Sequence, residues 1–396
     1  MRIVIIADAY PPMRTSAAVQ LRDLSQEMVR QGHDLTVMIP SSDLVAPWLL
    51  EVANDVQVLR LKAPHTKDIG YVQRTINEFL LPFVMLRNLR ISPLAQVRWE
   101  GVVWYSPSIF FGPIARALKK ASSCRSYLII RDIFPEWAAD MGLMKRGLIY
   151  GFFKSIAHYQ YSVADVIGVQ TLGNTSYFAD WAKHEGRRVE VLQNWLADAP
   201  DVGCSISVND GPLAGRTIFV YAGNMGVAQG MDVLLDLAER MRSRHDIGFL
   251  FVGRGRDAMR LLDDAKARRL DNVAFHDEID PAEIPGLYSQ CHVGIVALDQ
   301  RHKTHNIPGK FLSYMQAGLP VLACINPGND LAVLIQQECV GRVCTDHSVD
   351  TLQRLALELV DEITSGKNVA ENCRVLSTKL FSPVTAVQQI VAALVC

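Results

Sequence analysis

The sequence predicts an α/β protein made of two successive parallel-sheet domains. Residues 2–7 are a continuous apolar run, residues 17–30 carry apolar side chains at helical spacing, and residues 35–39 are apolar again. This strand–helix–strand order is typical of a nucleotide-type fold whose parallel sheet is covered on both faces. Residues 217–242 repeat the order, with a glycine-rich turn between strand and helix. A chain of 396 residues is long enough for two complete cores.

The composition argues against several other classes of protein. Apolar residues make up 49% of the chain and the net charge is −1, so the basic surface of a general nucleic-acid-binding protein is not expected. The eight cysteines show neither CxxC pairs nor metal-ligand spacing, and we expect reduced thiols in a cytoplasmic protein. Residues 1–8 resemble a core strand rather than a signal peptide. We find no apolar run of the roughly 18 residues that a bilayer span needs.

Turn-rich residues divide the chain between the two predicted sheets. The stretch from residue 197 to residue 215 is weakly apolar and rich in Asp, Pro and Gly, which is typical of a linker between domains. We therefore predict a first domain over residues 1–196, a linker over 197–215, a second domain over 216–380, and a C-terminal helix over 381–396.

Two carboxylates and an arginine follow the predicted strand at residues 127–130. Arg131, Asp132 and Glu136 lie in the segment Arg-Asp-Ile-Phe-Pro-Glu-Trp, at the carboxyl end of a parallel strand, where α/β folds place their sites. A carboxylate there can accept a hydrogen bond from an attacking hydroxyl group and orient it. The alternative is structural, because Glu136 follows Pro135 and would then sit in the first turn of a helix.

Two glycine-containing turns in the second half suggest phosphate binding. Gly223, Asn224 and Gly226 follow the predicted strand at 217–221, and Arg254 follows the next one within Gly-Arg-Gly. Backbone N–H groups in such strand-to-helix turns bind phosphates. An exposed arginine that caps a turn is an equally good interpretation of Arg254.

The most informative stretch, residues 306–323, is predicted to be loop, helix, turn and strand. Pro308 and Gly309 begin a helix that carries Lys310 in its first turn, and Gly318 is suited to end it. A helix N-terminus with a lysine offers free N–H groups, a positive dipole end and a cation to one phosphate. The alternative is an ordinary βα unit with a surface lysine.

These motifs resemble the retaining family-4 glycosyltransferases of GT-B fold, in which a Pro-Gly-Lys or Pro-Ser-Lys turn leads into a helix and then Ala-Gly-x-Pro-Val. Most members carry two glutamates in this stretch, and the matching positions here are His305 and Ser313. That departure, together with the Arg-Asp-x-Phe-Pro-Glu segment, resembles the bacterial O-antigen, capsule and colanic-acid transferases. The glycines of the family's first loop are replaced near Ser16.

The resemblance implies two Rossmann-like domains that face each other across a cleft, and a retaining transfer that needs no metal or other cofactor. The donor would be a UDP-sugar, such as an N-acetylated deoxyhexosamine, and the acceptor a lipid-linked saccharide of lipopolysaccharide, O-antigen or capsule synthesis at the cytoplasmic face of the inner membrane. Catalytic roles are implied for Asp132 and Glu136, and acceptor contacts for Ser16 and Arg131. Donor contacts are implied for Gly223, Asn224, Gly226, Arg254, His305, Asn306, Gly309, Lys310 and Ser313.

Two questions stay open at this level. The basic amphipathic segments 71–99 and 145–154 are either packed helices or a surface for peripheral contact with an anionic membrane. The function also has two alternatives, an enzyme of the same fold resembling UDP-N-acetylglucosamine 2-epimerase and a sugar-nucleotide-binding protein without catalysis.

Overall fold

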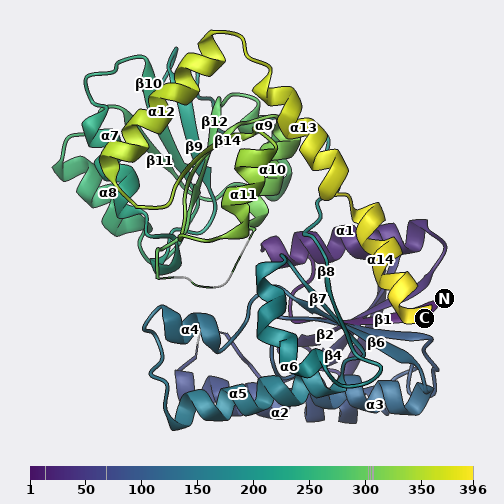
Figure 1. The fold of residues 1–396 in the computed structure, drawn as a ribbon. Coiled ribbons are helices and arrows are strands. Elements are labelled where there is room, and N and C mark those ends of the chain that lie inside the picture. Colours follow the sequence, from purple (N-terminus) through teal and green to yellow (C-terminus); the bar gives the residue numbers. More distant parts are fainter. Residues whose placement is uncertain (14, 68, 302, 304, 306, 396) are drawn as a thin grey trace. The chain divides into compact units, whose positions relative to one another are not determined.

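The structure is a computed structural model that describes residues 1–13, 15–67, 69–301, 303, 305 and 307–395. The chain divides into two compact units (Figure 1). The first comprises Met1–Trp195 and the C-terminal helix α14 (Pro383–Val395), and the second comprises Leu196–Ser382. Both are α/β units built on a parallel sheet, which confirms the predicted fold class.

The described part of the first unit has an eight-stranded sheet in the order β3-β4-β2-β1-β5-β6-β7-β8. Neighbouring strands are parallel except β3 and β4, which are antiparallel. The strands are β1 (Arg2–Ile6), β2 (Asp34–Ser41), β3 (Trp48–Ala53), β4 (Val56–Lys62), β5 (Gly101–Tyr105), β6 (Arg125–Ile130), β7 (Val166–Val169) and β8 (Arg188–Val191).

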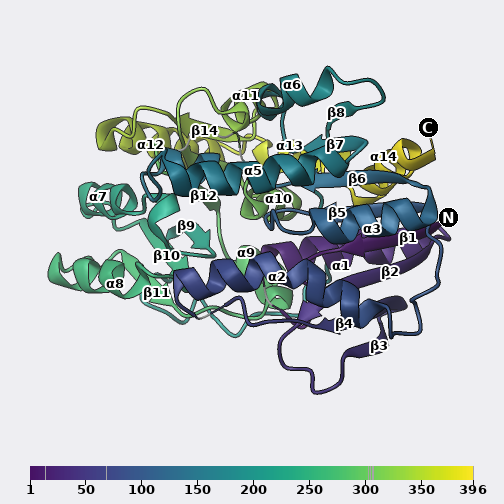
Figure 2. The same ribbon diagram turned by 90° about the horizontal axis from the view of Figure 1, so that it is seen from below.

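Helices cover both faces of this sheet (Figures 1 and 2). Met85 of α2, Ile114 of α3 and Tyr161 of α5 are buried in one core cluster. Leu24 of α1 and Ile390 of α14 are buried in the cluster on the other face. The helices are α1 (Ser16–Arg30), α2 (Tyr71–Leu89), α3 (Gly112–Ser122), α4 (Glu136–Asp140), α5 (Leu148–Val163), α6 (Ala179–Ala182) and α14.

The second unit contains, among the described residues, a six-stranded parallel sheet in the order β11-β10-β9-β12-β13-β14. Helices α9, α10, α11 and α13 bury side chains on one face, and α7, α8 and α12 on the other. The strands are β9 (Thr217–Ala222), β10 (Ile247–Val252), β11 (Val273–His276), β12 (Val293–Ala297), β13 (Val321–Cys324) and β14 (Gly341–Cys344). The helices are α7 (Asp232–Arg240), α8 (Ala258–Ala267), α9 (Ile284–Tyr288), α10 (Gly309–Ala317), α11 (Asp330–Gln337), α12 (Val349–Thr364) and α13 (Val369–Leu380).

The residues predicted to form a linker, 197–215, are part of the second unit. Ile206 and Leu213 are buried in its core. The backbone N–H of Val208 donates to Gln290 Oε1 at 2.9 Å. The turn residues that suggested a linker therefore shape a packed segment.

One helical stretch, Val369–Val395, is long and apolar enough to cross a membrane by length and composition, although we found no such run in the sequence. It consists of α13 and α14, which are separate helices. Leu376 of α13 is buried in the second unit's core and Ile390 of α14 in the first unit's core. Both apolar faces thus have partners within the protein.

Candidate functional site

Helix α10 is fixed against the second sheet by a buried tyrosine. The Tyr314 hydroxyl donates to the backbone carbonyls of Val220 (3.0 Å) and Ile295 (3.2 Å), on β9 and β12. Gly294 makes room for the ring, because a Cβ there would lie 2.4 Å from it. The helix begins after Pro308 and ends at Gly318, which adopts the left-handed conformation that a helix stop favours. Its N-terminus lies at the carboxyl edge of the sheet.

Lys310 lies in the first turn of α10, beside the turn that follows β9. Its Nζ is 3.8 Å from the centroid of the Tyr221 ring and 3.4 Å from the position that a Cβ on Gly223 would occupy. Burial lowers the pKa of the Lys310 ammonium group to about 7, because desolvation disfavours the charged form. Among the described residues no carboxylate pairs with it, so its charge is available to an anionic ligand.

Two glycine turns, after β9 and after β10, are packed against each other. The N–H of Met225 donates to the carbonyl of Arg254 at 2.8 Å. Gly253 and Gly255 have φ of 141° and 152°, and a Cβ at either would approach backbone atoms to 2.1 Å and 2.2 Å. Only glycine permits this approach. The packing fixes the turn at Gly223 opposite Lys310.

The other residues predicted to bind the donor through this turn have partners within the protein. The Asn224 amide donates to Gln229 Oε1 at 3.3 Å, and the Gly226 N–H donates to the same oxygen at 3.1 Å. Arg254 is 70% exposed and its Nε lies 2.8 Å from Glu278 Oε2. The structure therefore brings Gly223 and Lys310 together, whereas Arg254 forms an ion pair with Glu278.

His305 and Ser313, the positions that match the family's two glutamates, have different contacts. His305 Nδ1 lies 3.1 Å from Asp330 Oδ1 on the first turn of α11. Ser313 is half-buried on α10, and its hydroxyl donates to the Gly309 carbonyl at 3.5 Å, within the helix. Asn306, also predicted to contact the donor, lies outside the described residues.

The first unit places Asp132 at the carboxyl edge of its sheet, directly after β6. Burial raises the pKa of the Asp132 carboxyl above its usual value, and the neighbouring Arg131 charge opposes that rise. Arg131 itself is only 5% exposed, with its guanidinium carbon 4.4 Å from the Trp195 ring centroid. Its Nη1 donates to the Leu192 carbonyl at 3.4 Å. Arg131 is thus packed within the first unit, and its predicted acceptor contact stays a prediction.

Glu136 is the first residue of α4, as the structural alternative predicted. Its Oε1 accepts from the Tyr150 hydroxyl at 3.4 Å and lies 3.7 Å from Lys154 Nζ. These contacts join α4 to α5 and occupy the carboxylate. Among the described residues, the Asp132 carboxylate makes no comparable hydrogen bond or ion pair.

Two further residues lie at this edge. Ser16 is exposed in the first turn of α1, after the N-cap Thr15, whose hydroxyl accepts from the Ala18 N–H at 3.3 Å. Asp8 follows β1 and was not predicted. Burial raises the pKa of its carboxyl, opposed by the charge of Lys67. The sequence could have indicated Asp8, because an acidic residue that follows a core strand of a parallel sheet lies at the same edge as Asp132.

The structure shows no candidate metal site among the described residues. Their His, Cys, Asp and Glu side chains form no group of three or more that could hold a metal ion. The predicted independence from metals stays a prediction.

Sequence comparison finds glycosyltransferases. A family model described as "Glycosyl transferases group 1" matches residues 216–362, which lie in the second unit. The probable glycosyltransferase WbjE of Pseudomonas aeruginosa is 22% identical over 91% of this chain and 89% of its own length. The putative colanic acid biosynthesis glycosyl transferase WcaI of Escherichia coli is 24% identical over 94% and 96%.

Solved structures with the same fold are also glycosyltransferases. Sucrose-phosphate synthase from Thermosynechococcus elongatus superposes with a TM-score of 0.77 at 13% identity, over 99% of this chain and 98% of its own. HepE from Anabaena, in complex with UDP and glucose, gives 0.70 at 14% identity, over 100% and 99%. WaaG, a glycosyltransferase involved in lipopolysaccharide biosynthesis, gives 0.64 at 15% identity, over 98% and 99%. The chain is therefore a glycosyltransferase of GT-B fold whose second unit contains a group 1 glycosyl transferase domain.

Proposed function

We propose that the enzyme transfers a sugar from a UDP-sugar and that its second unit binds the UDP diphosphate. The observation that carries this proposal is Lys310, a partly buried cation beside Gly223 in the first turn of α10, with no carboxylate partner among the described residues. The helix dipole and the lysine would stabilise the departing diphosphate, which is the main electrostatic task in such a transfer. In this scheme their combined positive charge serves in place of a metal ion. The complex of HepE with UDP and glucose supports the choice of nucleotide.

The first unit would bind the acceptor, with Asp132 orienting the attacking hydroxyl group. Its carboxyl is partly buried at the sheet edge, and its raised pKa brings it closer to the range in which a proton is readily accepted. We propose retention of the anomeric configuration and an N-acetylated deoxyhexosamine as the sugar, on the family resemblance. The relative WcaI and the structural neighbour WaaG support a role in envelope polysaccharide synthesis of the colanic-acid or lipopolysaccharide type.

A lipid-linked acceptor would require contact with the membrane, and α2 and α5 offer a surface for it. Helices that follow parallel strands begin at the carboxyl edge of the sheet, which is the edge of Asp132. Near that edge large apolar residues are exposed beside exposed cations, including Arg74 and Lys145. Such a surface suits an anionic leaflet. The exposed apolar residues are Tyr71, Val72, Ile76, Phe79, Leu80 and Phe83 on α2 and Leu148, Ile149 and Phe152 on α5.

A ligand screen tests the donor. Thermal unfolding of the purified enzyme is measured with UDP, GDP and their sugar conjugates, and a ligand at about 100 times its Kd should add roughly 2.7 kcal/mol of stability. We expect a selective shift with UDP that Lys310→Ala reduces. A selective shift with GDP would overturn the donor, and no shift with any nucleotide would overturn the proposed site.

A product assay separates the two alternative functions. The enzyme is incubated with the UDP-sugar that gives the largest shift, with and without a lipid-linked saccharide. Release of UDP that depends on the acceptor supports transfer. Release of UDP with an epimerised free sugar and no acceptor would indicate the epimerase-like enzyme, and tight binding without any release would indicate a non-catalytic protein.

The membrane surface is tested by sedimentation with phosphatidylglycerol vesicles. Phe79→Ser with Phe83→Ser should reduce the bound fraction, whereas Val375→Ser, an exposed apolar residue on α13 of the second unit, should leave it unchanged. Equal binding by both variants would contradict the proposed surface.

A further inference from the structure

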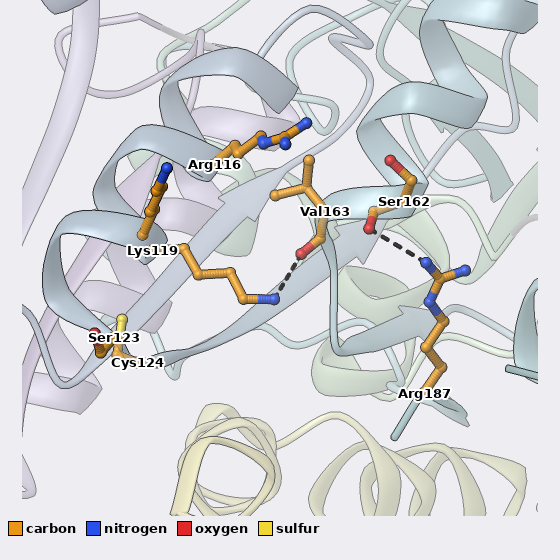
Figure 3. A pocket seen from close by; sticks show the side chains of 8 residues that line it. Arg116, Lys119, Ser123, Cys124, Ser162, Val163 and Arg187 are labelled. Carbon is orange, nitrogen blue, oxygen red and sulfur yellow. Dashed lines mark hydrogen bonds between the residues drawn. The ribbon is translucent and has the colours of Figure 1, made fainter. Parts of the chain in front are cut away.

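A basic hollow of about 680 Å³ lies at the opposite, amino edge of the first sheet (Figure 3). It is bounded by the last turns of α3 and α5 and by residues directly before β6 and β8. Its lining carries four cations and no carboxylate among the described residues. The lining residues are Arg116, Lys119, Lys120, Ser123, Cys124, Ser162, Val163 and Arg187.

Two of the four cations have partners within the protein. Lys119 Nζ donates to Asp165 Oδ1 at 2.7 Å and to the Val163 carbonyl at 3.0 Å. Arg187 donates to the Ser162 carbonyl at 3.5 Å, and its guanidinium carbon lies 5.3 Å from the Trp181 ring centroid. Figure 3 shows both side chains converging on the end of α5. These contacts hold two positive groups in place at the floor of the hollow.

The other two cations, Arg116 and Lys120, are exposed on α3. Neither makes an ion pair or hydrogen bond among the described residues. Lys120 lies in the last turn of α3, where the helix dipole favours a cation, but Arg116 lies one turn earlier, where that effect has fallen off. With Asp165 offsetting one charge, the hollow keeps about three positive charges that the described residues do not neutralise.

We propose that this hollow binds the phosphate group of a phosphate ester. A phosphate carries up to two negative charges and three strong acceptor oxygens, and it fits a mixture of arginine forks and lysine point charges better than a single carboxylate does. The ester belongs either to a lipid headgroup or to a soluble metabolite. This site is distinct from Lys310 and does not depend on the proposed function.

The test uses full-length enzyme with Lys310→Ala as the background, so that phosphate at the donor site does not contribute. Glycerol 3-phosphate is titrated calorimetrically at constant ionic strength, with sodium acetate as the carboxylate control. Sedimentation with phosphatidylglycerol and with phosphatidylcholine vesicles is measured in parallel. The pocket variant is Arg116→Gln with Lys120→Gln. The matched control is Lys266→Gln with Arg269→Gln, two exposed cations in the second unit.

We expect the pocket variant to bind glycerol 3-phosphate about tenfold more weakly, or weaker still, because loss of a single hydrogen bond to a charged group lowers the affinity by about that factor. The affinity of the control variant should be unchanged. Loss of phosphatidylglycerol binding alongside would assign the site to a lipid headgroup, and loss for the soluble ester alone would assign it to a metabolite. Equal binding by pocket variant and control, equal binding of acetate, or no binding of either phosphate source would overturn the proposal.

Discussion

The carboxyl edges of the two sheets present opposite charges. In the second unit the edge carries a partly buried cation, Lys310, whose pKa is lowered to about 7. In the first unit it carries partly buried carboxyls, Asp132 and Asp8, whose pKa values are raised. Desolvation is the largest cause in all three cases, and it favours the neutral form of each group.

Under the proposed function, this difference suits one type of fold to two tasks. At the second edge an anionic ligand would replace the lost solvation of Lys310, so that ligand binding and protonation of Lys310 would be coupled. At the first edge the Asp132 carboxyl would accept a hydrogen bond from the attacking hydroxyl group. If the two edges act separately, a substitution at one edge should leave the ligand affinity of the other unchanged.

Asp132→Asn should lower kcat/KM for sugar transfer by roughly 100- to 10,000-fold, because the amide cannot accept a proton as a carboxylate does. UDP affinity should be unchanged, since the residue is on the first unit. Steady-state transfer assays and calorimetry check both parts. Asp140→Asn, at the end of α4 and paired with Arg146, is the control. A parallel loss of UDP affinity would contradict a separation of the two edges.

Lys310→Ala should weaken UDP binding by roughly 10- to 100-fold, the equivalent of one charge-assisted hydrogen bond. The exposed Lys303, on the segment that leads to α10, is the matched control, and Lys303→Ala should change the Kd little. Calorimetric titration measures both. If the two substitutions had equal effects, the buried lysine would not be the diphosphate contact.

The affinity for UDP should fall as the pH rises above about 7. In the free enzyme Lys310 loses its proton near that pH, whereas the diphosphate complex needs the charged form, so binding takes up a proton. The expected loss is up to about tenfold per pH unit. Lys310→Arg keeps its charge at all these pH values and should flatten the dependence. Titrations in buffers of different ionisation enthalpy report the proton uptake, and a wild-type affinity that does not change from pH 7 to 9 would contradict the coupling.

Arg254→Gln should have the smallest effect, less than about threefold on the Kd for UDP. The arginine is 70% exposed and paired with Glu278, and exposed ion pairs contribute little. Glu278→Gln provides the comparison, because it frees the arginine without removing it. A loss as large as that of Lys310→Ala would place Arg254 on the diphosphate.

The elements with strong local signals could be predicted from the sequence. The local residue types predict a helix between Pro308 and Gly318, with Lys310 in its first turn. Strand β3 was missed, although Asn54 and Asp55, both with positive φ, form the turn that joins it to β4. An Asn-Asp pair between two strands is a hairpin signal, but residues 48–53 do not alternate clearly.

The roles of charged residues near the site depend on tertiary contacts that the local sequence does not predict. Nothing local distinguishes Arg131, which stacks on Trp195 in the core, from an arginine aimed at a ligand. For Glu136 the sequence left a catalytic and a helix-starting role open, and the contacts with Tyr150 and Lys154 favour the second. Partners distant in sequence determine whether a charged side chain is free to act.

The most direct test of the account is a nuclear magnetic resonance titration of Lys310 itself. Enzyme labelled with ¹³C-lysine is titrated with base, with and without saturating UDP, and the Lys310 signal is assigned from its absence in Lys310→Arg. We predict a pKa near 7 in the free enzyme and a rise of at least about one unit with UDP. An ordinary lysine pKa of about 10.4 that UDP does not move would contradict a buried, unpaired cation as the diphosphate site.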